Sequence, residues 1–168
     1  MSIQFELDEL TIGLASYQHA LRNVIELPRY YHDVKLPTLV NSACLETWLV
    51  NMRLFAEFFG ISGKIDKQSK DFKAADYLGI EIDEETKKKL NEIWLISSKL
   101  VVHLSKERNP ASNNFDAEGL LKNMNQYALL VLELSEKFEK ALTAAGSDYA
   151  FMIKVANASA RAYLMQSE

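Results

Sequence analysis

The sequence predicts an all-α protein, an antiparallel bundle of four to five helices that forms one domain over residues 1–168. Apolar residues recur at helical spacing through several long segments, and no stretch alternates apolar and polar residues as a half-buried strand does. The three prolines and four of the six glycines fall between those segments or at their ends. With 168 residues, of which 48% are hydrophobic and 25% charged, the chain is long enough to bury a core without disulfides.

The N-terminal half predicts two long helices. The first covers about Phe5–Leu27 and stops at Pro28, because proline lacks the N–H that continues a helix. The second covers Thr38–Gly60, where the glycine suits the left-handed turn that ends a helix. The polar connection that follows contains a short helical turn around Lys70–Leu78.

The C-terminal half predicts three more helices. The third opens at Asp83, a capping residue, and closes before Pro110. The fourth covers about Asp116–Ala145 and ends at Gly146, and the fifth runs from residue 147 or 148 to residue 164. Charged pairs one turn apart on the third helix are Glu84–Lys88 and Glu85–Lys89.

Charge and cysteine content exclude several classes of protein. The net charge is −4 and the isoelectric point is near 5.5, so no global field attracts nucleic acid, and we expect no DNA partner. The single Cys44 cannot pair within the chain, which predicts a reducing, cytoplasmic compartment. Acidic residues near the N-terminus do not suit a signal peptide, and no apolar run is long enough for a bilayer, so we expect no membrane partner.

The segment LETWLVNMRLFAEFF carries charges on a helix that is otherwise apolar almost all round. At ~100° per residue, Glu46, Arg53 and Glu57 fall on one narrow stripe. The stripe is either a thin solvent-exposed edge or a polar seam that faces another helix. Asn41 and Asn51 lie inside the apolar face itself, so their amides need hydrogen-bond partners.

The histidines do not predict a metal site. His19 lies opposite the apolar stripe of its helix, and His32 is in a linker with no partner at helical spacing. His103 is at the boundary of an apolar face near the end of the third helix, where it is either an acid or base near neutral pH or a structural residue. No nucleotide-binding, hydrolase or zinc motif is present, and we expect no cofactor.

Lysines recur every third position in the segment GKIDKQSKDFK. Four of them could follow a phosphate backbone, with Lys64 and Lys67 as candidate ligands. The alternative is a solvated connection, since Asp66 and Asp71 dilute the positive charge.

Three segments, LETWLVNMRLFAEFF, KAADYLG and VVHLSKER, together resemble a group of uncharacterised bacterial all-helical proteins. That group has a Leu-Glu…Arg helix, an Ala-x-Asp-aromatic turn and a later His-Leu-x-x-x-Arg segment, and the resemblance covers about residues 41–108. It implies one constellation of polar residues. Its members are Glu46, Arg53, Asp76, His103 and Arg108.

The same group is similar to HEPN domains, helical bundles that often act as RNases or as partners in toxin–antitoxin and defence systems. The catalytic signature of that family places an arginine before a histidine on one helix. Here His103 precedes Arg108, so the resemblance implies a HEPN-like fold without the signature, and it leaves open whether the protein is an enzyme.

Two hypotheses of function follow. In the first, Glu46, Arg53 and His103 form a pocket for RNA or a nucleotide phosphate, in which the arginine holds the phosphate and the histidine transfers a proton. Asp76, Arg108 and the two lysines above would then contribute to ligand binding.

In the second hypothesis the chain is a non-enzymatic interaction module, either antitoxin- or immunity-like or a homodimer. The acidic balance and the missing catalytic signatures favour it. The aromatic linker PRYYHDV also favours it, because Arg29, Tyr30 and Tyr31 are typical of interface anchors.

Overall fold

The computed structural model describes residues 7–61, 72–98, 119 and 122–165. Within these residues the secondary structure is helical, with no strand, which confirms the predicted all-α bundle. The helices are α1 (Leu7–Tyr31), α2 (Thr38–Phe58), α3 (Ala74–Tyr77), α4 (Glu84–Ser97), α6 (Met124–Ala144) and α7 (Ala150–Met165).

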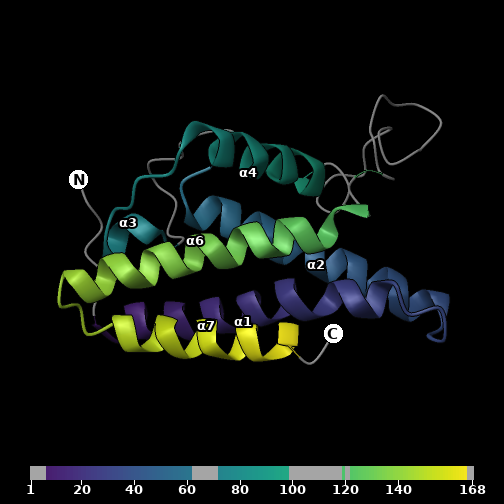
Figure 1. Ribbon diagram of the computed structural model, residues 1–168, viewed down its shortest axis with the longest axis horizontal. Coiled ribbons are helices and arrows are strands. Elements are labelled where there is room, and N and C mark those ends of the chain that lie inside the picture. The colour runs from purple at the N-terminus through teal and green to yellow at the C-terminus, as the bar shows by residue number, and fades with distance from the viewer. Residues whose placement is uncertain (1–6, 62–71, 99–118, 120–121, 166–168) are drawn as a thin grey trace.

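Helix α1 is the centre of the arrangement, since it contacts α2, α6 and α7 (Figure 1). Helix α4 packs on α2, and α6 packs on α7. The turn between α1 and α2 extends past the ends of α6 and α7, at the right of Figure 1. No described helix has the length and hydrophobicity needed to cross a membrane.

The core is rich in aromatic rings, most of which meet edge to face or tilted. Phe58 lies 5.0 Å from Tyr17 and 5.6 Å from Phe138, measured between ring centroids, so α1, α2 and α6 meet there. Trp48 and Phe55 of α2 are also buried, at 0% and 2% exposure. Helix α2 therefore supplies much of the apolar contact that holds the bundle together.

Helix α1 continues through Pro28 to Tyr31, so the predicted stop at Pro28 is wrong. A proline inside a helix leaves the carbonyl four residues earlier without its backbone donor. That carbonyl belongs to Val24, and it accepts a hydrogen bond of 3.1 Å from the indole Nε1 of Trp48 on α2. A tertiary contact thus replaces the missing bond.

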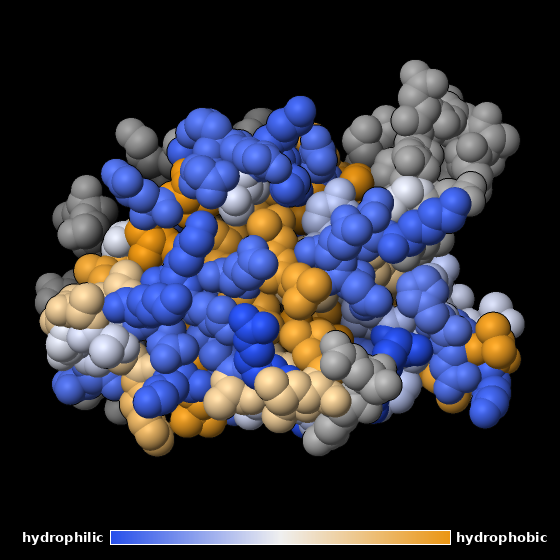
Figure 2. All heavy atoms as spheres, viewed as in Figure 1, coloured by the Kyte–Doolittle hydropathy of each residue, from blue (hydrophilic) through white to orange (hydrophobic). Residues whose placement is uncertain are grey.

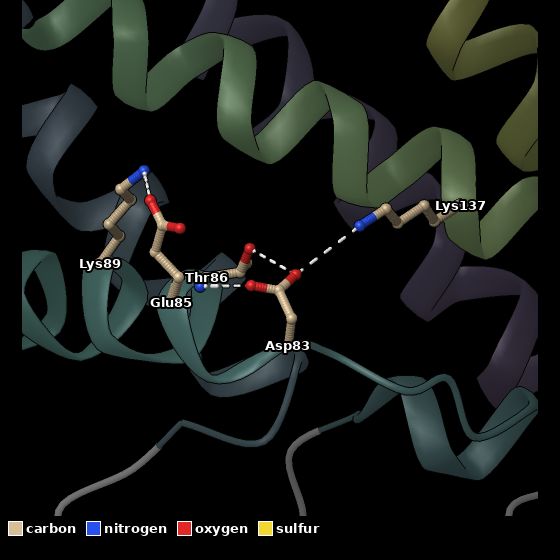
Figure 3. Close-up of polar contacts among 5 residues, drawn as sticks. All are labelled: Asp83, Glu85, Thr86, Lys89 and Lys137. Carbon is tan, nitrogen blue, oxygen red and sulfur yellow. Dashed lines mark hydrogen bonds and ion pairs between the residues drawn. The ribbon is translucent and has the colours of Figure 1, made fainter.

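The predicted ends of several helices are confirmed. Gly60 and Gly146 have positive φ angles of 86° and 66° just after α2 and α6. The cap of α4 is also confirmed, because Asp83 accepts hydrogen bonds of 2.9 Å from the backbone N–H and the hydroxyl of Thr86 (Figure 3). The predicted end of the third helix before Pro110 and the start of the fourth at Asp116 lie outside the described residues.

The charged pairs on α4 are partly as predicted. Glu85 pairs with Lys89 at 2.7 Å (Figure 3), but Glu84 pairs with Lys87 at 2.6 Å instead of with Lys88. Positions three and four apart are both neighbours on a helix surface, so sequence spacing alone does not decide between them.

Candidate functional site

The charged stripe on α2 is divided between two environments. Glu46 is exposed, whereas Arg53 and Glu57 lie at the contact with α4. The Nε of Arg53 donates to Oε1 of Glu57 at 2.8 Å, and Nε1 of Trp94 on α4 donates to the same oxygen at 2.9 Å. Both alternatives for the stripe are therefore partly right, since one end is an exposed edge and the other is a polar seam.

Within this polar seam the positive charge of Arg53 is already paired with the carboxylate of Glu57. Its guanidinium is paired with Glu57 and lies 5.6 Å from the ring centroid of Trp94, and its side chain is 26% exposed. A phosphate would have to compete with this carboxylate for the arginine. The geometry supports a structural role for the pair, which attaches α4 to α2.

The remaining members of the predicted constellation are not brought together within the described residues. Glu46 precedes Arg53 by two helical turns, about 10 Å along the axis, and forms no hydrogen bond or ion pair with it. Asp76 is exposed and accepts a hydrogen bond of 2.7 Å from the backbone N–H of Lys73, at the start of α3. His103, Arg108, Lys64 and Lys67 lie outside the described residues, so their place in a site stays a prediction.

The aromatic linker is divided in a similar way. Arg29 donates to the hydroxyl of Tyr30 at 2.7 Å and lies 4.7 Å from its ring centroid, and this hydrogen bond raises the pKa of Arg29 further above its ordinary value. Tyr31 is half-buried, and its carbonyl accepts a hydrogen bond of 3.0 Å from Asn41. Arg29 is therefore the exposed member of this group, and both tyrosines are half-buried.

The amide N–H groups of both asparagines of α2 find hydrogen-bond acceptors, whereas Oδ1 of Asn41 is buried without a partner among the described residues. The amide of Asn41 donates to the carbonyls of Tyr31 and Asp33 at 3.0 and 3.1 Å, which ties the start of α2 to the end of α1. The amide of Asn51 donates to the carbonyl of Thr47 at 2.7 Å. Their role is structural.

The pattern of charged residues does not point to the outer face of α2, which is largely apolar. Glu46 is its only charged member, and Leu39, Val50 and Leu54 are 81%, 40% and 50% exposed. The exposed residues of α2 are Thr38, Leu39, Val40, Ser42, Ala43, Glu46, Thr47, Val50 and Leu54. The sequence does contain a sign of this face. A helix that is apolar almost all round is usually buried on every side, so apolar residues on an exposed side of α2 are unusual.

Helix α4 shows what an ordinary solvent-facing helix of this protein looks like. All of its exposed residues are charged except Asn91 and Leu95. The surface over α4 is accordingly blue, at the top of Figure 2. The apolar outer face of α2 therefore contrasts with α4, whereas α7 also exposes apolar side chains, those of Phe151, Val155 and Met165.

A hollow of about 250 Å³ lies beside this face, between α1 and α2. Small residues of α1 create it, namely Gly13, Ser16 and Ala20. Because Leu54 lines the hollow and is also half exposed, the hollow borders the outer face of α2. The full set of described lining residues is Gly13, Ser16, Tyr17, Ala20, Leu54, Phe55, Glu57, Phe58 and Phe72.

No candidate metal centre is present among the described residues, where no three His, Cys, Asp or Glu side chains gather. His19 is exposed and lies 3.1 Å from the amide of Asn23, measured from its Nε2. His32 is exposed and packs edge-on against Tyr31.

Comparison with known proteins adds no relative. No protein-family model, curated protein or solved structure matches the chain. A function must therefore be argued from the geometry of the chain alone.

Proposed function

We propose that the chain is a non-enzymatic interaction module that binds another protein chain through the outer face of α2. The observation that carries the proposal is the composition of that face, which exposes Leu39, Val50 and Leu54 around a single charge. Contiguous apolar surface that is rimmed by polar residues marks interaction sites on soluble proteins.

The energetics favour covering this face. Moving a Leu or Val side chain from full exposure to full burial stabilises by about 1.5–3 kcal/mol. Because the three side chains are partly to mostly exposed, covering them contributes a few kcal/mol in total, before the costs of association. This burial favours association, and the apolar surface that the partner buries in the same contact adds to it.

The alternative, a pocket for RNA or a nucleotide phosphate, has less support in the described geometry. Its arginine, Arg53, is engaged by Glu57 and Trp94, and its carboxylate, Glu46, lies two turns away on the exposed edge. A HEPN-like relationship remains a proposal that rests on the sequence motifs and on the all-helical bundle. An antitoxin- or immunity-like role is one form that the interaction module could take.

The proposal is tested by placing a charge on the face. Ala43→Glu adds a carboxylate at the middle of the outer face of α2, and Asn91→Glu adds the same group to the exposed side of α4. Tagged versions of the wild type and of both variants are expressed in the native host, purified, and weighed as complexes by native mass spectrometry.

We expect Ala43→Glu to lose the bound chain and Asn91→Glu to keep it, with both variants folded as judged by circular dichroism. If Ala43→Glu retained the same complex as the wild type, the outer face of α2 would not be the interaction surface.

A further inference from the structure

The structure also indicates what covers the outer face of α2. Resting on the interaction role just proposed, we infer that the partner is a second copy of this chain. The two α2 helices lie antiparallel across a two-fold axis that passes between Glu46 and Thr47. The order of side chains along the face, the hollow beside it and its charge support this pairing.

Six of the nine exposed residues of α2 are placed symmetrically about that midpoint, namely Leu39, Ala43, Glu46, Thr47, Val50 and Leu54. In a two-fold antiparallel pair, residues at equal distances on either side of the midpoint face each other, and every contact occurs twice. Leu39 then faces the partner's Leu54, and Ala43 faces the partner's Val50. Glu46 faces the partner's Thr47. The apolar residues along this ~22 Å of helix thus meet apolar residues, and the two polar residues meet each other.

The sizes of the facing side chains also match. Ala43 is small and meets a branched valine, so the two helices interdigitate as side chains do when ridges pack into grooves. A parallel pair would instead place Ala43 on the partner's Ala43 and Glu46 on the partner's Glu46. It would therefore leave a gap at one level and oppose two like charges at another.

The hollow supplies space where the antiparallel pair needs it. Leu39 is 81% exposed in the first turn of α2, with Val40 exposed beside it. In the proposed register Leu39 of one copy comes over the other copy's Leu54, at the border of the 250 Å³ hollow. The projecting Leu39 therefore has an apolar recess to enter, and the pair contains two such recesses.

The charge distribution selects a second copy over a strongly charged partner. The face carries one carboxylate, that of Glu46, which the hydroxyl of the partner's Thr47 can bind as a donor. A highly charged partner would lose the hydration of its charges on this face and find little to pair with. The exposed side of α4, dense in charge, is left facing solvent.

The first test is the mass of the purified full chain in solution. We expect sedimentation equilibrium over ~10 µM to ~1 mM to show a monomer–dimer equilibrium, because one helix pair forms a small interface. Ala43→Glu should weaken the dimer at least tenfold, and Asn91→Glu should leave it unchanged.

The second test measures the register by disulfide cross-linking, with Cys44→Ser as the background to remove the native thiol. Ala43→Cys together with Val50→Cys should give a covalent dimer under mild oxidation. These two positions are about 10 Å apart within one helix and so cannot bridge inside a chain. Ala43→Cys alone, and Leu39→Cys with Ala43→Cys, are matched controls that should remain uncross-linked.

The outcomes separate this inference from the proposed function. A strict monomer at ~1 mM would overturn the second copy as partner, while a complex from the native host that is lost in Ala43→Glu would still support the interaction role. A dimer insensitive to Ala43→Glu would contradict both. Cross-linking by Ala43→Cys alone would show a parallel pair and overturn the register.

Discussion

At the scale of single residues, Tyr17 begins a buried chain of hydrogen bonds that joins three helices. Its hydroxyl donates to the Ser135 hydroxyl at 2.6 Å, and Ser135 in turn donates to the side-chain carbonyl of Asn157. The Asn157 amide donates to Glu139 at 2.8 Å, so the chain of bonds runs from α1 through α6 to α7. Such a network is stabilising only while every member has its partner.

Tyr17→Phe should therefore lower the free energy of unfolding by about 1–2 kcal/mol at neutral pH, because Ser135 loses a donor in a buried site. The variant should also change the response to alkaline pH. Burial raises the pKa of Tyr17 well above its ordinary value of 10.0. A folded-state pKa above the unfolded one means that the stability is complete below pH 10 and falls as the pH rises further.

Urea unfolding between pH 8 and pH 11 measures this effect. The wild type should lose stability above pH ~10 more steeply than Tyr17→Phe, by up to one proton per molecule. Equal slopes for the two proteins would show that Tyr17 ionises without unfolding.

At the scale of elements, Pro28 and Trp48 show how one helix completes another. The proline cannot bond to the Val24 carbonyl, and the indole N–H of Trp48 does so from α2. The α1–α2 pair is therefore joined by a polar contact inside an apolar interface, and α1 gains its last turn.

We expect Trp48→Phe to destabilise the protein by about 2–4 kcal/mol, through a cavity and through an unpaired carbonyl at Val24. In the Pro28→Ala background the restored backbone N–H can serve that carbonyl, so the same substitution should cost about 1 kcal/mol less. A double-mutant cycle in urea measures the coupling. Additive losses would mean that the indole hydrogen bond does not compensate for the proline.

The carboxylate of Asp83 caps the start of α4. Hydrogen bonds from the backbone N–H and the hydroxyl of Thr86 lower the pKa of Asp83 below its ordinary value of 3.8. A lowered folded-state pKa means that the cap stabilises above pH ~4 and is lost as the pH falls below it.

Asp83→Ala should accordingly be less stable than the wild type at pH 7, whereas Asp83→Asn should retain most of the stability because its amide oxygen still caps the helix. Urea unfolding between pH 7 and pH 2.5 should show a smaller acid-dependent loss for both variants than for the wild type. An unchanged pH dependence in Asp83→Ala would assign the acid sensitivity to other carboxylates.

At the scale of the whole molecule, α1 and α4 flank α2 while the outer face of α2 stays uncovered. The most apolar of the described long helices therefore has one side exposed at the surface. Pairing of two copies explains that placement, since each outer face then becomes interior.

The melting temperature should therefore depend on protein concentration. A hundredfold increase, from ~10 µM to ~1 mM, should raise it by a few degrees, because the dimer binds the native and not the unfolded chain. Differential scanning calorimetry measures the shift, and Ala43→Glu should abolish it. A melting temperature independent of concentration in the wild type would mean that native chains do not associate in this range.

Local patterns in the sequence determined the helical class of the protein and most of the helix ends. Gly60, Gly146 and Asp83 act through the backbone of their own turn, so their effect is visible in a short segment. The periodicity of α2 likewise placed Trp48 and Phe55 in the core and Glu46, Arg53 and Glu57 on one line.

Only the tertiary structure decided what those positions meet. Whether Arg53 faced water or another helix depended on where α4 packs, and whether Pro28 ended α1 depended on an indole twenty residues further along the chain. The hollow beside Leu54 exists because small residues of α1 face α2. The residues that meet in these contacts come from segments far apart in sequence. Helical spacing therefore determines the face on which a residue lies, and only the packing of the helices determines its neighbour.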